Sequence, residues 1–365
     1  MIPFVDFKAQ LRPLEKEIQA AIRRVLKSGW FILGEELRAF EEEFAAYVGT
    51  QYAVGVNSGT DAIHLALLAV GVKPGKEVVT VANTCVPTIC AIAATGARIV
   101  LADIEPETLT MDPASLESKI TSKTAAIVPV HLYGHPCNME EICEIARQRN
   151  IPVVEDCAQA HGTLWQGRKC GTFGHAGAFS FYPTKNLGAY GDAGAVVTND
   201  PDVAAFLRKL RNYGEEKRYT HVTQGFNSRL DEIQAAILRV KLKYLDEWNV
   251  ARRIRADWYR QGLRSRSVEK PVEHGEAYCI YHLYVIRSPY RDALQSHLHD
   301  HGISTLIHYP IPVHLQPAYR KLGYREGDFP NAEKACKEVL SLPMYPELKK
   351  SAINTICSAI NTFDP

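Results

Sequence analysis

Residues 176–196 read AGAFSFYPTKNLGAYGDAGAV. Two short apolar runs, 176–181 and 193–198, flank a loop that holds one lysine, Lys185, and several glycines. Lysines mostly lie on polar surfaces, because an unpaired ammonium is seldom buried. Here the flanking residues are small and apolar, and glycines allow turns and close backbone approach that other residues block. Two interpretations are open: an ordinary loop lysine, or a chain that is shaped around its amine.

Apolar runs of this kind recur along the first two hundred residues. Near-continuous apolar strands are buried on both faces, as in a mostly parallel sheet covered by helices. Ile63, Ala66, Leu67 and Val70 form one face of a helix between two runs, and 138–149 behaves similarly. We therefore expect an α/β domain with a seven-stranded, mostly parallel sheet covered by helices. The seven runs are 52–56, 77–82, 97–104, 125–134, 151–158, 176–181 and 193–198.

The two ends of the chain have a different pattern. An N-terminal helix is expected, with Gly29 as its stop, and it should pack against the strand region. Its apolar positions are Leu14, Ile18, Ile22 and Val25. A later helix should continue its apolar stripe to Trp248, and that stripe is Ile233, Ala236, Ile237, Val240 and Tyr244. The last hundred residues, with strand-like 281–286, read as a smaller α+β domain. We place the boundary between 1–245 and 246–365.

Composition excludes several classes of protein. The 365 residues are 46% hydrophobic and 23% charged with a net charge of +1, as in an ordinary globular protein. Without a long basic tract, neither nucleic acid nor a membrane surface is an expected partner. No run approaches the roughly 18 apolar residues of a membrane span, and the N-terminus does not resemble a secretory signal. The nine cysteines form no C-x-x-C pair, so we expect reduced, mostly buried thiols, a cytoplasmic protein and no metal site.

Three strand ends carry groups that suit one cofactor. Ser58, Gly59 and Thr60 follow the first strand and open a helix, which makes a site for an anion. Asp156 ends an apolar strand, where an acid is costly unless it meets a cation or a hydrogen-bond donor. Lys185 follows a third strand. Pyridoxal phosphate needs an anion site, a carboxylate for its ring nitrogen and a lysine. Taken singly, each feature also fits a helix cap, a solvated strand end or a loop lysine.

Several motifs in order resemble one enzyme family. The chain is similar to the DegT/DnrJ/EryC1/StrS sugar aminotransferases, which depend on pyridoxal phosphate and have the aspartate aminotransferase fold, fold type I. The resemblance extends from the N-terminus to LSLPMYPEL (340–348). The motifs that carry it are SGTDAIHLAL (58–67), EDCAQAHG (155–162), FSFYPTKNLGAYGDAGAV (179–196) and GFNSRLDEIQAAIL (225–238).

The resemblance implies a role for each matching residue. Lys185 would bind the cofactor covalently and move a proton, and Asp156 would pair with the ring nitrogen. Gln159 would lie near the phenolic oxygen of the ring. The expected phosphate contacts are Ser58, Gly59, Thr60 and Ser180, joined by Asn227 from the neighbouring subunit of a homodimer with shared active sites. At Cys85 the chain departs from the many relatives with an aromatic residue that stacks on the ring, and we expect a packing role there.

The resemblance also suggests substrates. The family moves an amino group, usually from L-glutamate, to a ketone of a nucleotide-linked sugar or, in some members, of a cyclitol. Residues 227–238 and 308–319 are more similar to members that act on 3-keto sugars than to those that act on 4-keto sugars. The expected substrate contacts are Trp30, Phe31, Gly34, Arg229, His308 and Tyr309. Family members that are dehydratases have histidine in place of the lysine, so Lys185 argues against that class. A regulatory protein that only retains the fold is the other alternative.

Overall fold

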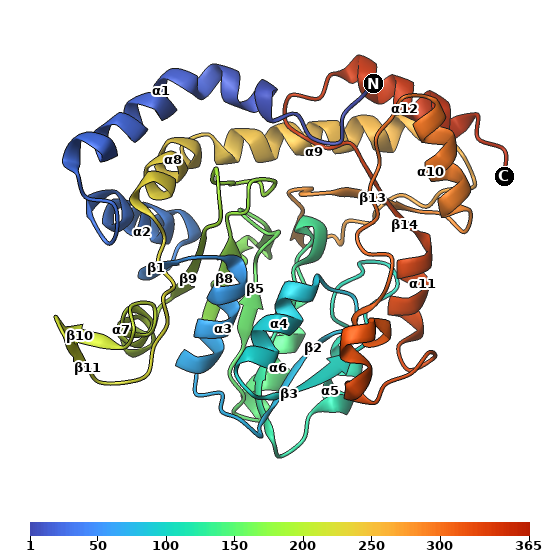
Figure 1. Ribbon diagram of the computed structural model, residues 1–365. Coiled ribbons are helices and arrows are strands. Elements are labelled where there is room, and N and C mark those ends of the chain that lie inside the picture. The colour runs from blue at the N-terminus through green and yellow to red at the C-terminus, as the bar shows by residue number, and fades with distance from the viewer.

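A seven-stranded sheet lies at the centre of the computed structural model, which describes residues 1–365 (Figure 1). Its strands are β1 (Tyr52–Val56), β2 (Glu77–Val81), β3 (Arg98–Ala102), β4 (Thr124–Ile127), β5 (Val154–Asp156), β8 (Ala176–Ser180) and β9 (Gly194–Thr198). The groups β1-β9-β8-β5 and β3-β2-β4 are joined by parallel bridges from Ile127 to Val153 and from Val130 to Asp156. The order is therefore β3-β2-β4-β5-β8-β9-β1, and only β9 runs antiparallel to its neighbours.

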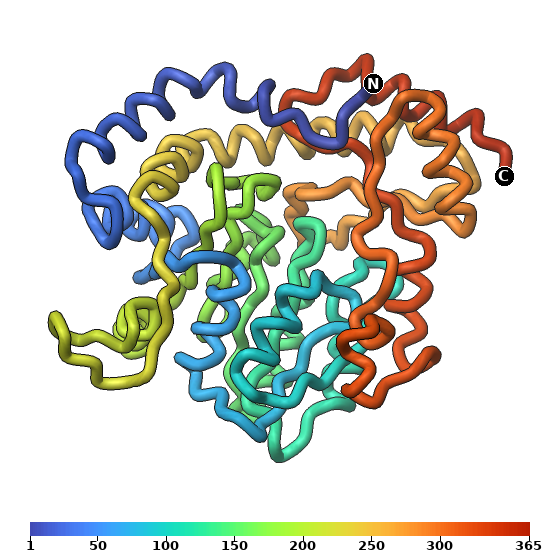
Figure 2. The backbone as a smooth tube through the Cα atoms, viewed as in Figure 1, coloured from blue at the N-terminus to red at the C-terminus, as the bar shows by residue number.

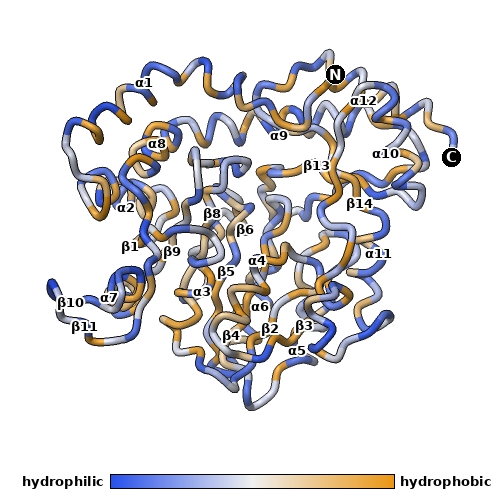
Figure 3. The backbone as a smooth tube through the Cα atoms, viewed as in Figure 1, coloured by the Kyte–Doolittle hydropathy of each residue, from blue (hydrophilic) through white to orange (hydrophobic).

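The sheet confirms the predicted fold class. Each of the seven predicted runs coincides with one of the seven strands, with β4 beginning one residue before its run, and nearly all strand residues are buried, as expected where helices cover both faces. Figure 3 shows hydrophobic residues along these central strands and the helices beside them. The helices of this region are α2 (Glu35–Val48), α3 (Gly59–Ala69), α4 (Val86–Ala94), α5 (Pro113–Lys119), α6 (Met139–Gln148) and α7 (Pro201–Leu210).

The N-terminal helix is α1 (Phe7–Ser28), which starts at an Asp6 cap and ends at Gly29 in the left-handed conformation, as predicted. The prediction that it packs against the strand region is wrong. Its buried residues instead meet the apolar side of α8 (Glu232–Leu242) and form a separate small core with it. Figure 1 shows α1 above α8, away from the sheet. The apolar stripe of α1 is equally suited to packing on the sheet and on another apolar helix face, so the sequence alone does not identify α8 as its partner.

The later helix is two helices. After α8 the chain turns at Lys243 and Tyr244 and continues as α9 (Leu245–Gly262), so the predicted single helix is wrong. At the turn the amide of Tyr244 bonds to the carbonyl of Lys241, three residues back, at 3.0 Å. That bond tightens the turn and changes the helix direction. The predicted apolar stripe still packs as one surface, since Trp248 joins the core between α1 and α8.

The C-terminal part has its own core around an antiparallel pair, β13 (Tyr284–Arg287) and β14 (Val339–Leu342). The helices α10 (Arg291–Asp300) and α12 (Lys350–Asn361) pack in this core, whereas α11 (Pro330–Glu338) places Ala332 and Ala335 in the core of the central sheet. The N-terminus joins it, because the amide of Ile2 bonds to the carbonyl of Gly302 at 2.8 Å. Figure 2 draws both ends of the chain in the upper right of the view, beside this part. Short pieces complete the fold: η1 (Leu132–Gly134), β6 (Leu164–Trp165), β7 (Arg168–Lys169), β10 (Glu215–Lys217), β11 (Thr220–His221), β12 (Ala277–Tyr278), η2 (Val313–Leu315) and η3 (Pro317–Leu322).

The nine cysteines are all free thiols, and six of them are buried, which agrees with the predicted reduced state. Cys90 is the exposed one, while Cys85 and Cys143 are partly buried. None of the helices combines the length and the apolar composition needed to cross a bilayer.

Candidate active site

A cavity of about 390 Å³ opens at the carboxyl ends of the central strands. This edge is where open α/β sheets place their sites. Seven of the residues predicted to bind cofactor line it together, although they come from three separate stretches of the chain: Ser58, Gly59, Thr60, Asp156, Gln159, Ser180 and Lys185. A larger open hollow of about 720 Å³ over α2, β1 and α7 contains none of these seven.

The loop of Lys185 folds tightly over the end of β8. The amide of Lys185 bonds to the carbonyl of Tyr182 at 2.8 Å, and the amide of Ala189 returns to the carbonyl of Phe181 at 2.7 Å. A side chain at Gly188 would put its Cβ 2.3 Å from the Pro183 oxygen. Backbone this close admits only glycine. The loop is therefore shaped around its lysine, which answers the question raised by its sequence.

The environment of Lys185 favours a neutral amine. The side chain is half-buried in the cavity wall, and burial lowers its pKa, while the nearby Cys85 and Asp156 act in the opposite direction. Lysine attacks a carbonyl only when it is neutral, so a lowered pKa increases the reactive fraction. This is the property that a lysine needs for covalent attachment to an aldehyde.

Asp156 lies at the end of β5 and is 4% exposed. Its Oδ1 accepts a hydrogen bond from the Ala158 amide at 3.0 Å, and its Oδ2 accepts one from the Thr88 hydroxyl at 2.8 Å. Burial raises the pKa of Asp156, and these two donors together with Lys185 oppose the rise. A buried carboxylate held by two donors is placed to pair with a cationic ring nitrogen.

The N-terminus of α3 supplies the anion site. Ser58 caps the helix by accepting from the Asp61 amide at 3.1 Å, which leaves the amides of Gly59 and Thr60 without partners inside the helix. A Cβ at Gly59 would lie 2.4 Å from the Cβ of Ser180, so glycine allows the helix end to reach the Ser180 hydroxyl. Free amides at a helix N-terminus, with a hydroxyl beside them, are typical of phosphate binding.

Gln159 connects the cavity with the predicted substrate loop. Its Oε1 accepts from the Tyr133 amide at 2.6 Å, and its Nε2 donates to the Tyr309 hydroxyl at 3.3 Å. His308 precedes this tyrosine, and its carbonyl accepts a hydrogen bond from the Tyr133 hydroxyl. Its ring nitrogen Nδ1 lies 2.8 Å from the Ser341 hydroxyl, and burial lowers the pKa of His308 to about 4. His308 is therefore neutral at physiological pH.

Seven predicted site residues do not line this cavity in the single chain: Trp30, Phe31, Gly34, Asn227, Arg229, His308 and Tyr309. Trp30 and Phe31 are exposed, at 63% and 48%, in the connection between α1 and α2. Gly34 caps α2, donates to Glu232 at 2.8 Å and lines the larger hollow instead. Asn227 is exposed, and Arg229 donates to Asn212 at 3.0 Å.

Some cavity residues were missed from the sequence. Thr84 and Thr88 flank Cys85 after β2, and all three line the cavity. Their signal was present, because two hydroxyls follow an apolar strand at the edge of the sheet where Asp156 also lies. Cys85 does line the cavity, close to Tyr309 and Lys185, and burial raises the pKa of its thiol. A thiol with a raised pKa is a weak nucleophile, which agrees with the expected packing role.

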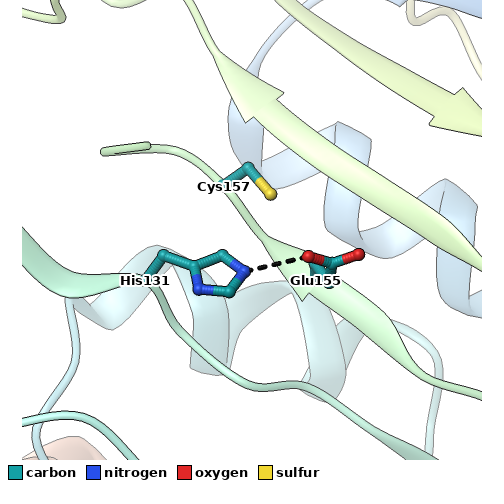
Figure 4. A group of neighbouring side chains, drawn as sticks. All are labelled: His131, Glu155 and Cys157. Atoms are coloured by element: carbon teal, nitrogen blue, oxygen red, sulfur yellow. Dashed lines mark hydrogen bonds and ion pairs between the residues drawn. The ribbon is translucent and has the colours of Figure 1, made fainter. Parts of the chain in front are cut away.

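A second buried group of polar side chains lies along β5, where the ligand atoms of His131, Glu155 and Cys157 are within 4.8 Å of one another (Figure 4). The His131 Nδ1 accepts from the Cys137 amide at 3.0 Å, so its Nε2 carries the proton and donates to Glu155 at 3.0 Å. Glu155 also accepts from three backbone amides of 171–174. With the imidazole and carboxylate atoms already engaged, the group is a hydrogen-bonded network that holds this segment on β5.

The cavity residues fit pyridoxal phosphate. Unpartnered helix amides suit its phosphate, and the buried carboxylate suits its ring nitrogen. A lysine with a lowered pKa suits its aldehyde, so the donor set matches the three parts of the cofactor.

Comparison with known proteins identifies the family. The sequence model described as the DegT/DnrJ/EryC1/StrS aminotransferase family matches residues 13–361. The chain is 48% identical to dTDP-3-amino-3,4,6-trideoxy-alpha-D-glucose transaminase of Streptomyces venezuelae, over 98% of this chain and 95% of that protein. It is 46% identical to the pleiotropic regulatory protein of Geobacillus stearothermophilus, over 99% and 98%.

A solved structure agrees with the sequence comparison. The structure of S. venezuelae DesV in complex with a ketimine intermediate superposes with a TM-score of 0.97 at 48% identity, covering 99% of this chain and 97% of that one. The predicted fold type and the predicted dependence on pyridoxal phosphate are confirmed. This chain belongs to the DegT/DnrJ/EryC1/StrS aminotransferase family.

Proposed function

We propose that this protein transfers the amino group of L-glutamate to the C3 ketone of a nucleotide-linked keto-deoxyhexose. One observation carries the proposal: a single cavity brings together Lys185, Asp156 and the free N-terminus of α3. Glutamate would bind first and leave as 2-oxoglutarate, and the keto sugar would then occupy the same site and take the amine. The product is an amino sugar of the kind used in deoxysugar biosynthesis.

In this proposal the chain's own residues bind the cofactor and move protons. When bound, pyridoxal phosphate supplies an aldehyde for covalent attachment and a ring that accepts electron density. Lys185 holds the cofactor and then, as a free amine, moves a proton at the reacting carbon. Asp156 keeps the ring nitrogen protonated. The amides of Gly59 and Thr60, with the Ser180 hydroxyl, hold the phosphate.

Gln159 and the 308–309 loop would orient the cofactor ring and the sugar. Because the oxygen of Gln159 is already taken by the Tyr133 amide, its NH₂ group is the part left to donate toward a ring oxygen. A neutral His308 and the Tyr309 hydroxyl can hydrogen-bond sugar hydroxyls. A buried polar group that loses its partner costs about 1–3 kcal/mol, so these contacts would discriminate between sugars.

We further propose a homodimer in which the sites are shared. Asn227 and Arg229, together with Trp30, Phe31 and Gly34, lie outside their own chain's cavity, and the two aromatic side chains are exposed. Exposed aromatic clusters are typical of interfaces. In a two-fold dimer these residues would reach the partner's cavity, with Asn227 on the phosphate and the others near the sugar nucleotide.

Two further assignments remain proposals. The division into a cofactor-binding domain, 1–245, and a smaller domain, 246–365, is supported by the separate core around β13 and β14. However, the proposed boundary falls at the start of α9, at Leu245, and α9 packs along α12 of the smaller domain. One continuous helix therefore joins the two parts. A cytoplasmic location is supported by the nine free thiols, because oxidising compartments favour disulfides.

The C3 position is supported by the 3-amino sugar in the name of the S. venezuelae relative and by the similarity of 227–238 and 308–319 to 3-keto members. A 4-keto sugar or a cyclitol ketone is the alternative substrate. The test incubates the holoenzyme and glutamate with dTDP- and UDP-linked 3-keto and 4-keto hexoses and detects amino sugars by mass spectrometry. Turnover of the 4-keto isomers alone would overturn the C3 assignment.

A regulatory role is the second candidate, because one relative carries the name of a regulatory protein. The response of the cofactor's visible absorbance band to glutamate distinguishes the two candidate functions. A transaminase converts its bound cofactor to the amino form when glutamate is added, and the visible absorbance band then shifts. A protein that only retains the fold would keep its band unchanged over the same incubation.

A further inference from the structure

The carboxylate of Asp156, at the end of β5, accepts a hydrogen bond from a residue of α4, the helix that follows β2. Thr88 lies in the first turn of α4, is 1% exposed, and has its Oγ1 2.8 Å from Asp156 Oδ2. An ionised carboxylate only accepts hydrogen bonds, so Thr88 is the donor. The other oxygen of Asp156 accepts from the Ala158 amide. Both oxygens are thereby fixed, one by backbone and one by Thr88.

The direction of the hydrogen bond between Thr84 and Thr88 follows from the single proton that each hydroxyl carries. Thr84 Oγ1 lies 2.9 Å from Thr88 Oγ1. A hydroxyl has a single proton, and that of Thr88 is directed at Asp156, so Thr84 donates to Thr88. Thr84 is 4% exposed and, like the other two residues, lines the cavity. The three side chains form an ordered chain of donors that ends on the carboxylate.

Packing alone does not require a hydroxyl at position 88. Valine has nearly the same shape, and a buried hydroxyl without a partner costs free energy. A comparison is available at Thr80 on β2, which is fully buried and donates to the Val128 carbonyl at 2.9 Å, away from the carboxylate. Thr88 differs because its hydroxyl meets a charged group, where hydrogen bonds are stronger.

We propose that Thr88 is a positioning residue that orients the carboxylate of Asp156 toward the ring nitrogen of pyridoxal phosphate, and that Thr84 fixes the direction in which Thr88 donates. The inference rests on the role proposed for Asp156. Without Thr88 the Oδ2 atom loses its only side-chain donor, and the carboxylate is free to rotate away from the ring. The effect should therefore depend on whether the ligand has a ring nitrogen.

The test compares two ligands of the apoprotein by fluorescence titration: pyridoxal phosphate and its deaza analogue, in which CH replaces the ring nitrogen. Thr88→Val should raise the Kd for pyridoxal phosphate about tenfold, the size of one hydrogen bond to a charged group. The Kd for the deaza analogue should change less than about twofold. Thr88→Ser should restore normal binding, and Thr80→Val, the matched control, should leave both Kd values unchanged.

Other results of these titrations would contradict either the positioning role of Thr88 or the role of Asp156. An equal loss of affinity for both ligands with Thr88→Val would overturn the positioning role, since a general distortion does not distinguish them. If Thr88→Val does not fold, Thr84→Val tests the same chain and should weaken only pyridoxal phosphate. Asp156→Asn separates the two proposals. A loss specific to pyridoxal phosphate with Asp156→Asn but not with Thr88→Val contradicts this inference alone, whereas no specific loss with Asp156→Asn contradicts the role of Asp156 as well.

Discussion

The backbone amide of Tyr133 donates a hydrogen bond to Oε1 of Gln159 at 2.6 Å, and this contact fixes which end of the Gln159 amide group faces the cavity. Tyr133 adopts a left-handed backbone conformation, with φ at 60°, in a buried turn between β4 and α6. Such a conformation is uncommon for a residue other than glycine. The turn therefore directs an amide toward Gln159 and leaves Nε2 as the donor near Tyr309.

Gln159→Glu should weaken cofactor binding roughly tenfold or more. The carboxylate keeps the size of the amide but cannot donate a hydrogen bond, and it places a negative charge beside the ring oxygen. Fluorescence titration of the apoprotein with pyridoxal phosphate measures the Kd. Gln224→Glu, at an exposed position, is the matched control and should bind normally. An unchanged Kd for Gln159→Glu would mean that the NH₂ group does not face the cofactor.

Lys185→Ala should lower kcat by roughly 10⁴-fold or more, because both the covalent attachment and the proton-moving amine are lost. Borohydride reduction followed by peptide mapping identifies the modified lysine. Lys241 is the informative comparison, since it is also buried but donates to the Gly188 carbonyl and faces the Tyr190 ring. Cofactor attached to Lys241 in the unaltered protein would contradict the assignment.

Shared sites can be tested by mixing inactive variants. Lys185→Ala and Asn227→Asp should each be inactive, the second because it sets a carboxylate against the phosphate. If Asn227 serves the partner's cavity, a hybrid dimer regains one intact site of its two. Random mixing makes half of the dimers hybrids, so roughly a quarter of normal activity should return.

A control for this mixing uses two residues of one cavity. Lys185→Ala mixed with Asp156→Asn should recover nothing, because both groups line the same chain's cavity. Sedimentation gives the oligomeric state of each variant. A fully active monomer, or no recovery in the first mixture while the variants still form dimers, would rule out sharing through Asn227.

The sheet was predictable because its signals are local. Each run such as 52–56 or 193–198 is apolar over its whole length, as a strand buried on both faces must be. Ser58–Thr60, Asp156 and Lys185 followed from the same logic, since the ends of parallel strands meet at one edge, whereas the roles of Gln159, Ser180 and Asn227 came only from the family resemblance. The glycines and small residues around Lys185 left an ordinary loop lysine open, and its placement in this site came from the three strand ends taken together and from the family motifs.

The remaining features depend on contacts between distant segments. The apolar face of α1 has no mark that selects α8 over the sheet. No proline or glycine marks the turn at Tyr244. Thr88 and Asp156 are 68 residues apart, and only the assembled strand order brings them to 2.8 Å. Side-chain chemistry that forms across strands in this way has no local pattern in the sequence.

Lys241 makes stability depend on pH in a defined direction. The side chain is fully buried, and burial lowers the pKa of Lys241 to about 8, against about 10.4 for an unfolded lysine. Between these values the unfolded chain binds more protons than the folded one, so the stability contribution of Lys241 rises with pH from about 8 to about 10.4. Below pH 8 both states are protonated, and the charge lowers stability by about 3 kcal/mol.

Lys241→Met should remove this pH dependence. The methionine side chain is neutral and of similar length, so the variant should lack the rise in the free energy of unfolding that the parent gains from Lys241 between pH 8 and 10. The difference between parent and variant cancels the other groups that titrate in this range, Lys185 included. Lys243→Met, two residues along and exposed, is the control and should follow the parent at every pH. Urea unfolding at pH 7.5 and pH 10 provides the measurement, and a parent and Lys241→Met that respond identically to pH would show that Lys241 has an ordinary pKa in the folded protein.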